Sequence, residues 1–121
     1  MDIINIVSTK MMGMPFLVGF IFCVTGLVTY FFPPKTINHL YGYRTTASMK
    51  SQEIWDFAQR LSSMKMIQSG LFLIAVSSLK LLTNFFIEQE LLISLISLGI
   101  AVLYIFISVE SAIKKKFSKP E

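Results

Sequence analysis

The sequence predicts an all-α membrane protein with three transmembrane helices, and with a cytoplasmic loop and a short amphipathic helix between the first two. Hydrophobic residues make up 54% of the 121 residues and charged residues only 15%, which is too little charge for a soluble domain of this size. The apolar residues gather in runs long enough to cross a bilayer. A chain this short forms a single domain, residues 1–121.

The first predicted span covers residues 14–32 and the third covers residues 91–109. Both runs are uncharged and close to the roughly 20 residues that a helix needs to cross the hydrocarbon. The second predicted span covers residues 61–82, with Lys65 near one end and Lys80 near the other. This segment crosses the bilayer if both lysines extend their amines toward the interfaces.

The first span is expected to remain in the mature protein. A cleaved signal peptide carries a positive segment before its apolar core and small residues at its cleavage site. Here the preceding segment balances Lys10 against Asp2, and Pro33 and Pro34 directly follow the span. These prolines also end the first helix, since neither can donate a backbone hydrogen bond.

The distribution of basic residues predicts the orientation. Lysines and arginines gather in the loop 33–60 and in the tail 110–121, whereas the link between the second and third spans carries Glu88 and Glu90 and no base. The positive-inside rule therefore places the amino terminus outside and the loop and the carboxyl terminus in the cytoplasm. Lys114, Lys115 and Lys116 are expected to face anionic lipid headgroups.

The second half of the loop has the signals of a helix that leads into the second span. Ser48 or Ser51 can cap it, because a serine oxygen accepts a hydrogen bond from a free backbone N–H. Glu53 and Asp56 fall in its first turns, where the helix dipole favours acids. Asp56 and Arg60 are spaced for an i,i+4 ion pair.

Small and polar residues recur along all three spans and predict close helix packing in lipid. The alternative, a polar conduction path, would need an ionisable group near the middle of the membrane. Lys65, Lys80 and Glu110 are all expected near the ends of the spans, so packing is favoured. The residues are Gly19, Cys23, Gly26, Ser62, Ser63, Ser69, Gly70, Ser77, Ser78, Ser94, Ser97, Ala101, Tyr104 and Ser108.

No motif for catalysis, for a cofactor or for a metal is present. The sequence has no Gly-rich phosphate loop, no HExxH and no CxxC. Cys23 and His39 are single residues of their types, and each lacks a second metal ligand. The basic residues are those that any cytoplasmic flank of a membrane protein carries, so no nucleic-acid partner is expected.

The loop is longer than a connection between two neighbouring spans requires. We expect it to fold back over the amphipathic helix by a turn at Gly42. Arg44 carries a planar guanidinium suited to a carboxylate or a phosphate, and Glu53 and Asp56 are expected to hold it when it is unoccupied. The result would be a compact cytoplasmic cap that presents a docking surface.

Three aromatic residues of this loop, Tyr41, Tyr43 and Trp55, are expected at the membrane interface. They would either anchor a simple connector at the headgroups or form an amphipathic wall of the cap.

The loop also carries a specific motif. Asn38 is followed by "YGYRT" at residues 41–45 and by "SMKSQEIWDFAQ" at residues 48–59. This pattern resembles the signature of the SdpI family of small bacterial integral membrane proteins. The resemblance implies as binding or signature residues Asn38, Tyr41, Gly42, Tyr43, Arg44, Thr45, Ser48, Glu53, Trp55, Asp56 and Gln59.

The resemblance further implies a multi-pass protein of the bacterial cytoplasmic membrane. The namesake of the family confers immunity to a membrane-active toxin and also signals by holding a transcriptional repressor at the membrane; this chain shows fewer amino-terminal helices. The expected function is toxin immunity or stress protection through a peptide or protein partner. The alternatives are a structural or assembly subunit of a larger complex, then a transporter or channel subunit, then a lipid-acting enzyme. Exposed helix surface also favours a homo-oligomer.

Overall fold

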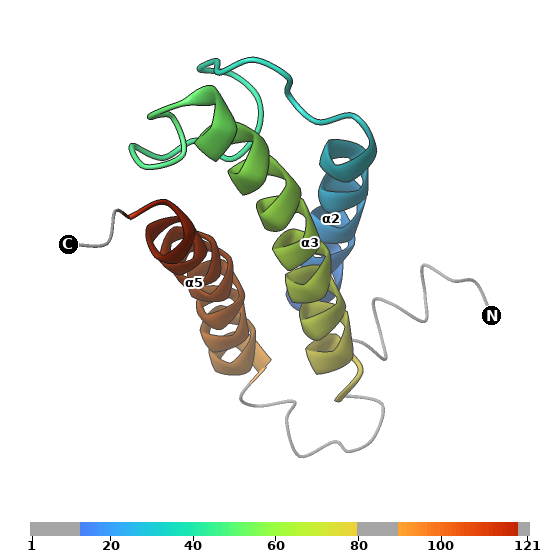
Figure 1. Cartoon of the computed structure of the whole chain (residues 1–121). Helices are drawn as coiled ribbons and strands as arrows, with labels where there is room; N and C mark the ends of the chain where they lie inside the picture. Colours follow the sequence, from blue (N-terminus) through green and yellow to red (C-terminus); the bar gives the residue numbers. More distant parts are fainter. Residues whose placement is uncertain (1–12, 80–89, 119–121) are drawn as a thin grey trace.

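A computed structural model of the chain describes residues 13–79 and 90–118, and this part is helical apart from one long loop. The helices are α2 (Gly13–Phe31), α3 (Gln52–Ser77) and α5 (Glu90–Phe117). Figure 1 shows α3 between α2 and α5, with the loop from α2 to α3 at the same end of the molecule as the last turns of α5. We call this the loop end.

Two of the three helices are long and apolar enough to cross a membrane. They are α2, with 19 residues, and α5, with 28 residues. α3 has 26 residues and is therefore roughly 39 Å long, but it carries many polar residues, and its crossing of the membrane stays a prediction. The chain is thus all-helical as expected, with two candidate spans.

α2 and α3 pack closely because glycines face one another at their crossing. A Cβ atom added to Gly19 would lie 2.7 Å from the carbonyl oxygen of Gly70, and one added to Gly70 would lie 2.6 Å from that of Gly19. A Cβ atom at Gly26 would lie 2.6 Å from Cγ1 of Ile67. The prediction that small residues mediate the packing is confirmed for this pair of helices.

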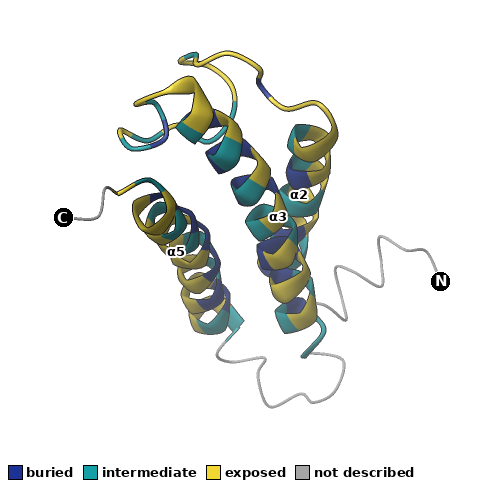
Figure 2. Ribbon diagram, in the orientation of Figure 1, coloured by how far each residue is buried: buried dark blue, intermediate teal, exposed yellow. Residues whose placement is uncertain are grey.

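α3 and α5 meet through a second set of small residues. The hydroxyl of Ser69 donates to the carbonyl oxygen of Ala101 at 3.2 Å, and Ser94 and Ser97 are also buried. Tyr104 does not follow this pattern, since 40% of it is exposed. The faces that turn away from α3 carry large apolar side chains and are mostly exposed (Figure 2).

A hydrophobic cluster joins α3 and α5 at the loop end. Ala58, Val109 and Ile113 form its buried centre. Phe57 and Phe117 pack edge to face beside it, with ring centroids 5.5 Å apart. This cluster fixes the last turns of α5 against the first turns of α3.

The start of α3 agrees with the prediction that the amphipathic segment leads into the second span, since the two form one continuous helix. Ser51 caps this helix by accepting from the N–H of Ile54 at 3.2 Å. Lys65 lies in the middle of α3, whereas its expected place near the end of the second membrane span stays a prediction. The predicted end of the span at residue 82, together with Lys80 and Glu88, lies outside the described residues.

Candidate functional site

The segment 32–51 between α2 and α3, here called the cap, is held by many hydrogen bonds. Its first turn is organised by Asn38, whose Oδ1 accepts from the N–H groups of Leu40 at 2.9 Å and Tyr41 at 2.7 Å. Such a side chain takes the place of a backbone carbonyl in a turn. The hydroxyl of Tyr41 then donates to the carbonyl oxygen of Phe32 at 2.8 Å, which returns the turn to the end of α2.

Gln59 binds the next residues of the cap to α3. Its Oε1 accepts from the N–H of Tyr43 at 2.7 Å, and its Nε2 donates to the carbonyl oxygen of the same residue at 2.7 Å. Gly42 makes this approach possible, since its φ is +101° and a Cβ atom there would lie 2.5 Å from Oε1 of Gln59. The predicted turn at Gly42 is confirmed.

Trp55 and Gln52 hold the first part of the cap. The indole N–H of Trp55 donates to the carbonyl oxygen of Pro34 at 2.8 Å, and Trp55 is fully buried. Nε2 of Gln52 donates to the carbonyl oxygen of Lys35 at 2.6 Å and to Oδ1 of Asp56 at 2.8 Å. The cap therefore covers Trp55, and its side chain has no exposed surface with which to contact headgroups. The position of Trp55 relative to the membrane interface stays a prediction.

Thr45 and Ser48 close the turn that precedes α3. The N–H of Thr45 donates to Oγ of Ser48 at 2.8 Å, and the N–H of Ser48 donates to Oγ1 of Thr45 at 3.1 Å. Of the two serines proposed as the helix cap, Ser51 fills that role. Ser48 is fully buried and links the backbone of Thr45 and Tyr43 instead.

Tyr43 connects the cap to α5. Its hydroxyl donates to Oε1 of Glu110 at 2.8 Å, and its ring lies 5.6 Å from that of Phe106. Burial of the phenol raises the pKa of Tyr43 above its ordinary value, and the hydrogen bond to the Glu110 carboxylate and its negative charge raise the pKa further. Tyr43 is thus a neutral donor that joins the cap to the third helix.

The charged residues of the motif do not pair as expected. Within residues 13–79 and 90–118 no ion pair joins Arg44 to Glu53 or Asp56, and none joins Asp56 to Arg60. All four side chains are exposed. The cap is instead held to α3 by the amide of Gln59 and the indole of Trp55, which bind backbone groups of the cap directly. Arg44 remains at the edge of the cap.

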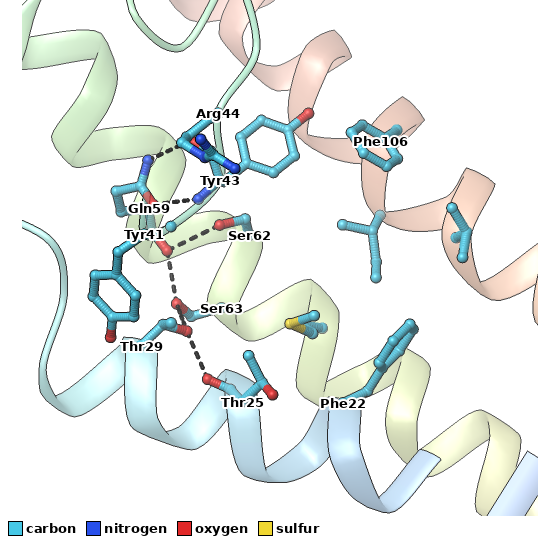
Figure 3. A pocket seen from close by; sticks show the side chains of 14 residues that line it. Phe22, Thr25, Thr29, Tyr41, Tyr43, Arg44, Gln59, Ser62, Ser63 and Phe106 are labelled. Carbon is cyan, nitrogen blue, oxygen red and sulfur yellow. Dashed lines mark hydrogen bonds between the residues drawn. The ribbon is translucent and has the colours of Figure 1, made fainter. Parts of the chain in front are cut away.

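A groove lies directly below the cap. Its volume is about 400 Å³, within the range of small-molecule sites. Figure 3 shows residues of α2, α3 and α5 converging on it, with Tyr41 and Arg44 at its loop end. The lining residues are Phe22, Thr25, Thr29, Tyr41, Gly42, Tyr43, Arg44, Gln59, Ser62, Ser63, Met66, Val102, Ile105 and Phe106.

One wall of the groove is polar. The hydroxyls of Ser62 and Ser63 donate to the carbonyl oxygen of Gln59 at 3.1 and 2.8 Å, and the hydroxyls of Ser63 and Thr29 lie 2.7 Å apart. The opposite wall is apolar and includes Phe106 (Figure 3). A ligand with both polar and apolar parts would match these two walls.

The remaining predicted residues lie away from the groove. Lys114, Lys115 and Lys116 are exposed on the last turn of α5, although Nζ of Lys116 also lies 4.4 Å from the ring centroid of Phe57. His39 is exposed. In the described part of the chain, no three His, Cys, Asp or Glu side chains gather in the manner of a metal site.

Several contacts of the cap were not predicted. Within the cap, the carbonyl oxygen of Pro34 accepts from Trp55. From outside it, Gln52 and Glu110 bind Lys35 and Tyr43, and only Glu110 had a signal, as an acid directly after an apolar run. A further cluster on α3 and α5 consists of Lys65, Gln68 and Tyr104. The i,i+3 spacing of Lys65 and Gln68 was the available signal for that cluster.

Comparison with known proteins gives a match to a family model and a match to a curated protein, and both point to the same family. A model of the SdpI/YfhL protein family matches residues 35–109, from the cap to the loop end of α5. The uncharacterized protein YfhL of Bacillus subtilis (strain 168) is 45% identical over 75 residues, which are 62% of this chain and 67% of that protein. No solved structure matches the chain.

Proposed function

Because the chain belongs to the SdpI/YfhL protein family, we propose that this membrane protein protects a bacterium against a membrane-active peptide. It does so by binding a peptide or protein partner in or at the membrane. The groove below the cap is the observation that carries this proposal. It combines a polar wall, an apolar wall and an exposed guanidinium at Arg44, and an amphipathic peptide offers the matching groups.

The proposal includes a placement in the bacterial cytoplasmic membrane. α2, α3 and α5 each cross the bilayer, with the amino terminus outside and with the cap and the carboxyl terminus in the cytoplasm. The lysines and arginines of the cap and of residues 114–116 support this orientation. The large apolar side chains on the outer faces of α2 and α5 would contact lipid.

The protein acts in this proposal by binding and not by catalysis. The hydroxyls along the groove already donate to backbone carbonyls within α2 and α3, so they serve the fold of the helices. Exposed surface on α2 and α5 also leaves room for a second copy or a larger complex.

The test is a protection assay with a substitution that fills the groove. Val102 lines the groove, so Val102→Trp should exclude a ligand from it. The wild type and the variant are produced in a bacterium that lacks the protein, and the cells are exposed to a panel of purified membrane-active peptides. Survival and membrane potential are then measured. We expect the wild type to preserve both against at least one peptide and Val102→Trp to lose that protection.

Leu103→Trp is the matched control, because Leu103 is the next residue and 59% of it is exposed outside the groove. This variant should protect as the wild type does. The proposal is overturned if the wild type protects against none of the peptides. It is equally overturned if Val102→Trp reaches the membrane in normal amounts and still protects.

A further inference from the structure

A polar cluster lies on α3 and α5, outside the groove. The ammonium of Lys65 donates to the hydroxyl oxygen of Tyr104 at 3.2 Å, and this hydroxyl donates to Oε1 of Gln68 at 2.6 Å. None of the three side chains is buried. They form a connected polar patch on a surface that otherwise carries large apolar side chains.

The neighbouring glycine contacts give the depth of this patch. Ser63 and Ile67, which flank Lys65 in α3, both contact Gly26, five residues before α2 ends at Phe31. Lys65 therefore lies roughly 8 Å along the helix axis from the end of α2. Under the proposed placement of α3 across the membrane, on which this inference rests, that position is inside the hydrocarbon.

The cluster keeps the ammonium at this depth. Side chains on a helix lean toward its amino terminus, so an unrestrained Lys65 would extend toward the loop end and its headgroups. Its amine instead binds the hydroxyl of Tyr104, and this hydroxyl binds Gln68. Gln68 lies almost one turn of α3 further from the loop end than Lys65 does. Tyr104 and Gln68 thus hold a positive charge below the level of the lipid phosphates.

In residues 13–79 and 90–118, no carboxylate lies at that depth. Among the described acids, Glu53 and Asp56 lie in the first turns of α3, Glu90 begins α5, and Glu110 is bound to Tyr43 at the loop end. The sequence places its other three acids outside the predicted spans. An ammonium has three donors, and the described contact uses one of them. A charge in hydrocarbon needs an opposite charge or strong acceptors.

We propose that this face of α3 and α5 is a docking site for a partner transmembrane segment with a carboxylate, which pairs with Lys65. A second copy of this chain would not provide the acid. A hollow of about 290 Å³ beside the cluster gives the partner's neighbouring side chains a place to pack. It is lined by Gln68, Ser69, Phe72, Ile100, Ala101 and Tyr104.

The test uses the full chain in phosphatidylcholine vesicles at pH 8, with a defined probe. The probe is a Leu/Ala transmembrane peptide that carries one Glu about 8 Å from one interface, and its twin carries Gln there. Energy transfer between labelled peptide and labelled protein gives the association constants. We expect the Glu peptide to associate about 5- to 30-fold more tightly than the Gln peptide.

The preference for the Glu peptide over the Gln peptide should disappear in Lys65→Gln, which keeps a hydrogen-bonding side chain but removes the charge. It should remain in Lys50→Gln, a matched change at an exposed lysine of the cap. In the reciprocal pair, Lys65→Glu should prefer a peptide that carries Lys. Equal binding of the Glu and Gln peptides by the wild type overturns the proposal, as does a preference that survives in Lys65→Gln.

A lipid occupant is a separate outcome. If phosphatidylglycerol at a tenth of the lipid abolishes the Glu preference through Lys65, the site belongs to a headgroup and the proposal fails. Val102→Trp separates this inference from the protective function. It should keep the Glu preference while it loses protection, so either claim can fail without the other.

Discussion

Gln59 is the residue on which the cap depends most. It is almost fully buried, and its amide exchanges two hydrogen bonds with the backbone of Tyr43. Its own carbonyl oxygen accepts from Ser62 and Ser63 below the cap. A single residue thus joins the fold of the loop to the polar wall of the groove, which explains why a glycine with positive φ stands opposite it.

Gln59→Leu should destabilise the protein by about 2–3 kcal/mol. The leucine fills a similar volume but leaves the N–H and carbonyl groups of Tyr43 without their partner, and an unsatisfied polar group costs about 1–3 kcal/mol. The measurement is thermal unfolding in detergent. Glu53→Gln is the control, since Glu53 is exposed at the start of α3 and should change stability by less than about 0.5 kcal/mol. Equal stability of Gln59→Leu and the wild type would refute this role for Gln59.

At the scale of elements, the pair α2–α3 differs from the pair α3–α5. The glycines at the first crossing bring two backbones into direct contact. The second pair is joined by a serine hydroxyl, by a polar cluster and by the hydrophobic cluster at the loop end. The first interface consequently tolerates no added atom, whereas the second leaves space for the groove.

Gly70→Ala should separate α2 from α3. The new methyl group would lie 2.6 Å from Sγ of Cys23 and from the carbonyl oxygen of Gly19, and overpacking of this kind costs about 1–3 kcal/mol. The distance between spin labels on α2 and α3 should increase, and the unfolding temperature in detergent should fall. Gly99→Ala is matched in chemistry but meets nothing within 4 Å, so helix propensity should make it neutral or stabilising. A normal interhelix distance in Gly70→Ala would contradict the glycine contact.

Much of this architecture was predictable from hydrophobicity and from the positions of small residues. The two apolar runs coincide closely with α2 and with most of α5, and Gly19, Gly26 and Gly70 lie at the predicted contact. The continuity of α3 was predictable as well, because the cap signals and the apolar positions after Ser51 lead directly into the second apolar run. The prediction that charged side chains hold the loop was wrong. Spacing along the chain does not show that Gln59 and Trp55 bind the backbone of Tyr43 and Pro34.

At the scale of the whole molecule, Tyr43 connects the cap of α2 and α3 to α5 through Glu110. The groove lies under this connection, so the position of α5 and the shape of the groove depend on the same hydrogen bond. The polar cluster at Lys65 lies on the other side of the contact between α3 and α5. A partner bound there would act on the helix that also forms one wall of the groove.

Tyr43→Phe should lower stability by about 1–2 kcal/mol near pH 7, because the variant loses a hydrogen bond to a carboxylate. The pKa of Tyr43 is raised in the folded protein. Above the ordinary tyrosine pKa of about 10, the unfolded chain therefore loses the phenol proton while the folded chain keeps it, and the wild type loses stability as pH rises. Unfolding temperatures measured from pH 7 to pH 11 should show the gap to Tyr43→Phe narrowing above pH 10. A constant gap would contradict the bond to Glu110.

The burial of Trp55 gives the protein an internal optical probe. It is the single tryptophan of the chain, and its indole N–H is held against the carbonyl oxygen of Pro34 under the cap. Its fluorescence therefore arises from one place, the contact between the cap and α3. Water reaching that contact would move the emission to longer wavelength. Ligands that lift the cap can thus be told from ligands that leave it closed, in unlabelled protein and in real time.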